Sequence, residues 1–114
     1  MDSEAKMIYV FDLDDTLCKT IYGVGPDGKY GPQYYDSTPI HHRIEVVNKL
    51  YEDGNTIIID TARGTASGKN WFNFTVDQLK SWDVKFHHVR TGKKFVSDYY
   101  VDDKAINDKE FFDG

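Results

Sequence analysis

Acidic side chains recur in this sequence directly after short apolar runs. Asp12 and Asp14 follow the apolar residues 7–11, and Asp102 and Asp103 follow a second apolar run near the C-terminus. Carboxylates that converge repel one another, and a bound cation relieves that repulsion. Mg²⁺ takes oxygen ligands, often one or two carboxylates, and retains several waters. The pattern therefore predicts a magnesium site between the two segments, provided that they are neighbouring strands.

A carboxylate at such a site can also attack phosphorus. An aspartyl-phosphate is a known covalent intermediate, and phosphoryl transfer depends mainly on positioning and charge neutralisation. Thr61 and Lys94 have side chains suited to holding a phosphate. Asp14, two residues after Asp12, is placed to protonate a leaving oxygen and then to activate water. These residues favour phosphate-ester chemistry.

A parallel sheet is needed to bring these residues together. Continuous apolar runs that end in polar residues are typical of buried parallel strands. In such sheets ligands lie beyond the carboxyl ends of the strands, where the acidic residues occur here. Strands alternating with helices predict an α/β fold with a mostly parallel sheet. The expected strands are residues 7–11, 56–59, 85–90 and 98–101.

Two segments have helical periodicity. Apolar residues recur at helical spacing through 40–51, with Thr38 as the expected N-cap, Pro39 as the first helical residue and Gly54 as the stop. The second helix is expected over 71–82, where apolar side chains share one face.

The composition predicts one soluble domain covering residues 1–114. The chain carries a formal charge of −5 and is 39% hydrophobic, enough for a core. It contains no apolar run long enough to span a membrane and no signal peptide at its start, so a cytoplasmic location without membrane partners is expected. A single cysteine, Cys18, excludes an internal disulfide. The negative charge disfavours nucleic acid as a partner.

The ordered set of motifs resembles that of the haloacid-dehalogenase (HAD) superfamily of phosphohydrolases. The four motifs are YVFDLDDTLC, IIIDTARG, Lys94 and YYVDDKAIND, which together span residues 9–108. The resemblance implies a Rossmann-like three-layer sandwich and a Mg²⁺-dependent phosphatase. The segment 50–64 is most similar to small members often described as capsular or surface-polysaccharide biosynthesis phosphatases.

The resemblance also implies roles for individual residues. Asp12 would be the nucleophile and a metal ligand, and Asp14 the general acid/base, giving the metal its backbone carbonyl. Thr61 and Lys94 would hold the phosphate. Arg63 fits a substrate ligand and a surface ion-pair partner equally well.

The fourth motif completes the implied metal site. Asp103 is favoured as the direct ligand and Asp102 as the supporting one, which gives a ligand set of Asp12, Asp14, Asp103 and Asp102. Phe95 follows Lys94 where many relatives have proline, so the neighbouring Lys93 is the alternative lysine. Asp60 adds an acid beside Thr61 with no role in the pattern.

No insertion in the chain is long enough to form a cap domain. Residues 19–37, rich in Gly and Tyr, are expected to form an irregular loop or short hairpin, the flap over the site in the family. Four tyrosines there could contact the substrate: Tyr22, Tyr30, Tyr34 and Tyr35. The family resemblance implies a phosphomonoester substrate, and we expect a small sugar phosphate. Because an open site holds little of the substrate beyond its phosphate, selectivity would come from the flap, a neighbouring subunit or a bulky substrate. We expect a homo-oligomer.

Other interpretations fit less well. A calcium-binding EF-hand loop starting at Asp12 would need Gly and Glu where Leu17 and Gly23 stand. Adjacent histidines diverge in helices and strands, so 41–42 and 87–88 are expected to be surface or core residues. Two functions remain as alternatives: a nucleotide or polynucleotide-end phosphatase, and a catalytically silent binding module.

Overall fold

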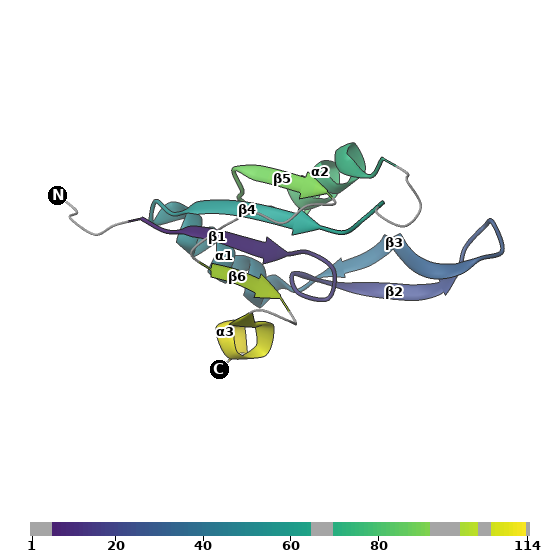
Figure 1. Ribbon diagram of the computed structural model, residues 1–114, viewed down its shortest axis with the longest axis horizontal. Coiled ribbons are helices and arrows are strands. Elements are labelled where there is room, and N and C mark those ends of the chain that lie inside the picture. Colours follow the sequence, from purple (N-terminus) through teal and green to yellow (C-terminus); the bar gives the residue numbers. More distant parts are fainter. Residues whose placement is uncertain (1–5, 65–69, 92–98, 103–105, 114) are drawn as a thin grey trace.

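The computed structural model describes residues 6–64, 70–91, 99–102 and 106–113. Five strands form a sheet in the order β5-β4-β1-β6-β7 (Figure 1). Every neighbouring pair is parallel, which confirms the predicted α/β fold with a parallel sheet. The strands are β1 (Ile8–Asp12), β4 (Thr56–Thr61), β5 (His88–Thr91), β6 (Tyr99–Asp102) and β7 (Ile106–Asn107).

Strand β1 lies at a topological switch point. The chain passes from β1 to β4 and β5 on one side, and later to β6 and β7 on the other. Ligands of open α/β sheets bind outside the carboxyl ends of the strands at such a point. Asp12 ends β1 and Asp102 ends β6, its parallel neighbour. The topology thus brings the first and fourth motifs to one sheet edge.

Three helices pack on this sheet: α1 (His41–Glu52), α2 (Phe72–Ser81) and α3 (Asp108–Asp113). Helix α1 contacts β4, α2 contacts β5, and α3 contacts β6 and β7. None of the helices within the described residues is long and apolar enough to cross a membrane. The buried core draws on the two central strands and the first two helices: Phe11, Ile57, Ile59, Ile44, Val47 and Leu79.

The predicted start of α1 is wrong. Thr38 and Pro39 are the last residues of a strand, in register with Lys19 and Cys18. The helix begins at His41, after an N-cap residue that makes no side-chain capping bond. Strand pairing prevailed over the capping preference of a Thr-Pro pair. The predicted stop is confirmed, because Gly54 directly follows the helix C-cap with φ +97°.

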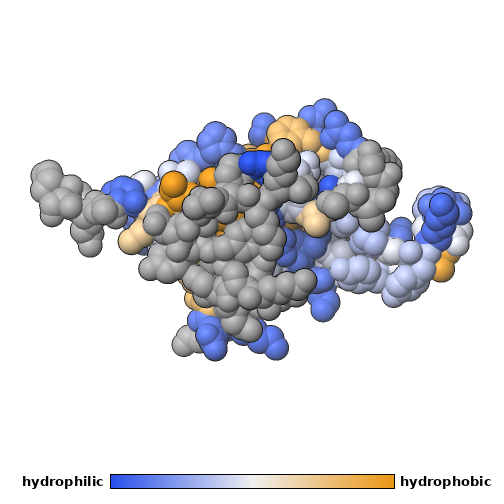
Figure 2. Space-filling model, viewed as in Figure 1, coloured by the Kyte–Doolittle hydropathy of each residue, from blue (hydrophilic) through white to orange (hydrophobic). Residues whose placement is uncertain are grey.

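The segment between β1 and α1 is a long antiparallel hairpin, more regular than the loop or short hairpin predicted. It consists of β2 (Cys18–Val24) and β3 (Tyr30–Pro39), which form a sheet of their own. Figure 1 shows it extending beyond the carboxyl ends of β1 and β4, along the 56 Å dimension of the molecule. Its surface is mostly hydrophilic (Figure 2). The hairpin therefore lies at the edge where the predicted site residues emerge.

The C-terminal segment, about which the sequence predicted nothing, contributes to the core. The ring of Phe111 lies 5.7 Å from that of Phe11 and 6.1 Å from that of Tyr9, and Phe112 lies 5.7 Å from Phe11. Helix α3 thereby covers aromatic side chains of the central strand.

Candidate active site

The loop after β1 is held by hydrogen bonds to one backbone carbonyl, that of Leu13. The oxygen of Leu13 accepts hydrogen bonds from the amides of Leu17 and Cys18 at 2.9 and 3.3 Å. Leu13 and Leu17 are fully buried, which anchors the loop in the core. Asp15 adopts φ 63°, in the left-handed region that Asp tolerates better than most residues. The loop therefore fixes the backbone of Asp14 relative to β1.

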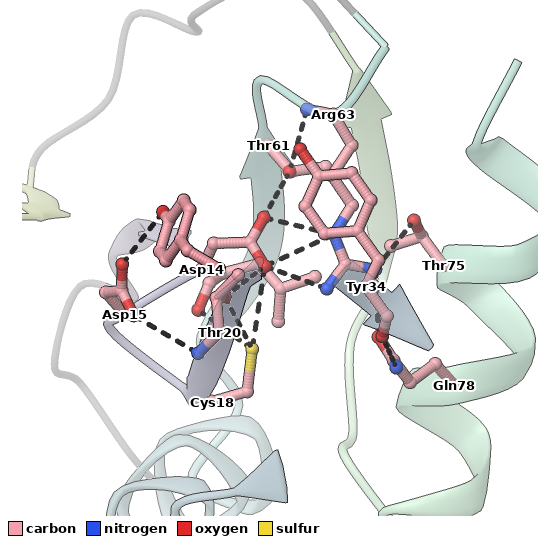
Figure 3. A network of polar contacts seen from close by, with 11 residues as sticks. Asp14, Asp15, Cys18, Thr20, Tyr34, Thr61, Arg63, Thr75 and Gln78 are labelled. Carbon is pink, nitrogen blue, oxygen red and sulfur yellow. Dashed lines mark hydrogen bonds and ion pairs between the residues drawn. The ribbon is translucent and has the colours of Figure 1, made fainter. Parts of the chain in front are cut away.

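The Asp14 carboxylate accepts hydrogen bonds from several directions (Figure 3). Arg63 donates from Nε at 3.0 Å and from Nη2 at 2.9 Å, as a buried ion pair. The hydroxyl of Thr20 donates at 2.7 Å, that of Thr61 at 3.4 Å, and the thiol of Cys18 at 3.7 Å. These donors come from the hairpin, from β4 and from the segment after β4. Asp14 is thus the point where the three meet.

Arg63 is a buried residue, whereas the sequence suggested a substrate ligand or a surface ion pair. Its side chain is 0% exposed, against 19% for Asp14. Besides Asp14, it donates from Nη1 to Gln78 Oε1 at 2.8 Å and to Thr75 Oγ1 at 3.3 Å. The ring centroid of Tyr34 lies 4.4 Å from the guanidinium carbon. Arg63 therefore forms an ion pair, with Asp14, but its side chain is buried and does not lie at the surface.

An aromatic cluster joins the hairpin to α2. Tyr34 and Tyr35 of β3 contact Trp71, with ring centroids 4.9 and 5.5 Å away, and Tyr35 lies 4.7 Å from Phe74. Gln78 of α2 adds a polar link by donating from Nε2 to the backbone oxygen of Tyr34 at 2.9 Å. The hairpin is therefore attached to the body of the molecule close to Arg63.

The remaining predicted residues differ in how far they can be placed. Asp12 is in register with Asp60 of β4 and lies at the end of β1, beside the strand that ends at Asp102. Asp60 is 3% exposed. Lys94 and Asp103 lie outside the described residues.

Thr61 joins the second motif to the first. Its hydroxyl accepts a hydrogen bond from the Arg63 amide at 3.1 Å and donates to Asp14. Thr61 is 3% exposed. Its contact with a phosphate stays a prediction, and its present partners are protein groups.

The sheet edge suits a hard cation. Asp12 and Asp102 end adjacent parallel strands, and carboxylate oxygens are ligands that Mg²⁺ accepts. Among the residues that the structure describes, no three His, Cys, Asp or Glu side chains form a metal-binding group. Asp103, the favoured direct ligand, is outside that set. Binding of Mg²⁺ at this edge therefore stays a prediction.

Burial and nearby charge raise the pKa values of three side chains around Asp14. Burial, and next the Asp14 carboxylate, raise the pKa of the Cys18 thiol to about 12. The same two causes raise the pKa of the Tyr34 phenol. Burial, and next the charge of Asp15, raise the pKa of the Tyr22 phenol. Cys18 can therefore donate a hydrogen bond here but is a poor nucleophile.

Sequence reasoning missed two residues of this network. Thr20 belongs to a segment that was read as a loop, where no face could be assigned. Gln78 lies on α2 one turn after the buried Thr75 and directly before the buried Leu79. Its spacing on that helix was the available signal, but a single glutamine in an amphipathic helix indicates nothing by itself.

The paired histidines are not arranged as chelates. His42 contacts the carboxylate of Asp113 at 2.7 Å. His87 accepts a hydrogen bond from the Ile57 amide at 3.0 Å, and its ring stacks on Tyr51. The predicted surface and packing roles are confirmed for these two residues.

The chain resembles a crystal structure of a structural-genomics target from Vibrio cholerae. The TM-score is 0.66 and the sequence identity 22%, over 94% of this chain and 87% of that chain. A likeness at this identity shows a shared fold. A scan against protein-family models and a search of curated proteins found no match.

Proposed function

We propose that the protein is a Mg²⁺-dependent phosphomonoesterase of the haloacid-dehalogenase type that works through an aspartyl-phosphate on Asp12. The finer fold description, a Rossmann-like three-layer sandwich without a cap, belongs to the same proposal. The described sheet, with its switch point at β1, is compatible with it.

One observation carries the proposal. Asp12 ends the central strand at the switch point, and Asp14, two residues later, is held by Thr61 and Arg63 of the second motif. Two segments that the sequence linked only by resemblance are therefore in direct contact. Asp14 accepts hydrogen bonds from four residues and retains 19% exposure, so part of its side chain stays accessible.

In the proposed reaction a carboxylate oxygen of Asp12 attacks phosphorus, and the bond from phosphorus to the leaving oxygen breaks. Asp14 is proposed to give a proton to that oxygen. Water then attacks the phosphorus of the aspartyl-phosphate while Asp14 takes a proton from the water. Asp12 and inorganic phosphate are released. The donors around Asp14 stabilise the carboxylate formed between the two steps.

Asp12, the backbone carbonyl of Asp14, and the acidic pair Asp102 and Asp103 would hold the Mg²⁺. The ion supplies charge neutralisation for the phosphoryl oxygens when bound. Lys94 is proposed to offset the rest of the phosphate charge.

The proposed substrate is a small sugar phosphate, in keeping with the similarity to polysaccharide-biosynthesis phosphatases, and the proposed setting is the cytoplasm. The tyrosines of the hairpin, of which Tyr35 is 68% exposed and Tyr30 is 75% exposed, offer ring surfaces for such a substrate. A panel of sugar phosphates and nucleotides at matched concentration would rank the substrate classes.

The proposal is tested by hydrolysis of p-nitrophenyl phosphate with and without Mg²⁺. We expect turnover that excess EDTA abolishes and added Mg²⁺ restores. Asp12→Asn should remove the activity, because an amide oxygen is a poor nucleophile. Asp36→Asn, which changes an exposed carboxylate of β3, is the matched control and should retain it. Full activity in EDTA, or an active Asp12→Asn variant, would refute the proposal.

A further inference from the structure

The Arg63 guanidinium is fixed on three sides. Its Nε and Nη2 face Asp14, its Nη1 faces α2, and one face of the group lies 4.4 Å from the Tyr34 ring centroid. The side chain is fully buried, so it cannot turn toward solvent. Because the fork is planar and rigid, its orientation sets the orientation of the carboxylate it binds.

Gln78 makes the shorter of two hydrogen bonds on the far side of this fork, the other being that to Thr75 Oγ1 at 3.3 Å. Gln78 Oε1 accepts from Arg63 Nη1 at 2.8 Å, while its Nε2 donates to the Tyr34 backbone oxygen at 2.9 Å. Only this orientation of the amide satisfies both partners, since a guanidinium donates and a carbonyl accepts. Gln78 therefore locks Arg63 and the hairpin in place with one side chain, which Figure 3 displays.

We infer that Gln78 is a positioning residue for the reaction: through Arg63 it directs the Asp14 carboxylate toward the leaving oxygen. The inference rests on the proposed function. Among the described residues Gln78 hydrogen-bonds to Arg63, which in turn hydrogen-bonds to Asp14, so its effect on Asp14 passes through the guanidinium.

A misdirected Asp14 has a specific kinetic signature. Protonation of the leaving oxygen matters greatly for an alkyl phosphate, whose alkoxide is a poor leaving group, and little for p-nitrophenyl phosphate. Loss of stability would lower the rates on both substrates by the same factor. The ratio of the two rates therefore separates positioning from folding.

The experiment compares kcat for wild type and Gln78→Met on ethyl phosphate and p-nitrophenyl phosphate, both with Mg²⁺. Methionine matches the length of glutamine but makes neither hydrogen bond. We expect a loss of at least about tenfold on ethyl phosphate and less than about threefold on p-nitrophenyl phosphate. Should Gln78→Met fail to fold by circular dichroism, Gln78→Glu replaces it. Its carboxylate competes with Asp14 for Arg63 and cannot donate to the Tyr34 backbone oxygen. The same larger loss of kcat on ethyl phosphate than on p-nitrophenyl phosphate is therefore expected.

Gln33→Met is the matched control. Gln33 also ties hairpin carbonyls together, donating to the oxygens of Gly23 and Gly31. It should leave the ratio of the two rates unchanged. Equal losses on both substrates, or no loss, in a folded Gln78 variant would overturn the inference and leave the proposed function standing. A wild-type protein that hydrolyses neither substrate would instead refute the proposed function.

Discussion

At the scale of single residues, the Asp14–Arg63 pair departs from an ordinary surface ion pair. The arginine is fully buried and the aspartate is 19% exposed. A buried charge must be compensated by partners, because removing it from water is costly. Arg63 has the Asp14 carboxylate, two neutral acceptors and an aromatic face. Its surroundings thus suit a fixed support better than a mobile substrate ligand.

Cys18 gives this site a measurable dependence on pH. Its pKa is raised to about 12 by burial and by the Asp14 charge, whereas the pKa of a thiol in an unfolded chain is about 8.5. Below the pKa of the thiol in the unfolded chain, both the folded and the unfolded states hold the proton, so this group does not change the free energy of unfolding. Above that pKa the unfolded chain releases a proton that the folded chain keeps, so the free energy of unfolding falls. We expect a loss of about 1–2 kcal/mol between pH 7 and pH 10.

Urea unfolding of wild type and Cys18→Ala across this pH range measures the effect. The alanine variant will be less stable at pH 7 because it loses packing, but that offset does not depend on pH. Only the slope of the free energy of unfolding against pH is informative, and this slope should be shallower in the alanine variant. Parallel curves would mean that the thiol titrates in the folded protein as it does in the unfolded one.

The sequence predicts the polar residues that follow buried strands. It does not predict the residues that join the network only through tertiary packing. Asp12, Asp14 and Thr61 stand at strand ends, where a change from apolar to polar residues is visible in the sequence. Thr20 and Gln78 join the same network through a hairpin and a helix face. Their role depends on where those elements pack, which no local pattern encodes.

At the scale of elements, β1 and β4 were predictable because buried parallel strands are continuously apolar. The hairpin was predicted only as a short one and only as an alternative to an irregular loop, since most residues of its two strands are not buried and the sequence lacks a clear hydrophobic alternation. Helix α1 was predicted from its periodicity, but its start was misplaced by the Thr-Pro signal within β3. Local signals thus predicted the elements with a buried face and failed for those set by pairing.

Helix α3 offers a test of packing at this scale. Phe112 is partly buried against Phe11, and Arg43 lies 5.2 Å from its ring centroid. We expect Phe112→Ala to lower the free energy of unfolding by about 2 kcal/mol, below the 3–5 kcal/mol that is typical of fully buried aromatics. Phe72→Ala is the control, because Phe72 is 42% exposed. Urea unfolding of both variants gives the comparison.

Equal destabilisation by the two substitutions would contradict the docking of α3 on the sheet. A second readout is activity on p-nitrophenyl phosphate at low temperature, where both variants are folded. Phe112 packs on Phe11, Phe111 and Arg43, and Phe72 is exposed, so we expect wild-type rates from both variants.

At the scale of the whole molecule, the fold gathers segments that are distant in sequence around one strand end. Asp14, Thr20 of the hairpin and Arg63 after β4 are separated by up to 49 positions, yet share hydrogen bonds. Because β1 is the switch strand, the chain first adds β4 and β5 on one side of it and later adds β6 and β7 on the other side. The hairpin extends beyond this edge (Figure 1). Under the proposed function, selectivity would come from its side chains or from a second copy of the chain.

The central claim is that Asp12 carries the phosphoryl group during turnover. The most direct test is to trap it, using radiolabelled p-nitrophenyl phosphate, Mg²⁺ and the Asp14→Asn variant. This substrate needs little help in leaving, so the intermediate still forms, while loss of the base slows its hydrolysis. After acid quenching, tandem mass spectrometry locates the label. We predict an alkali-labile phosphoryl group on Asp12 that is missing in Asp12→Asn/Asp14→Asn. Label on another residue, or hydrolysis by the wild type with no trapped intermediate, would contradict the account.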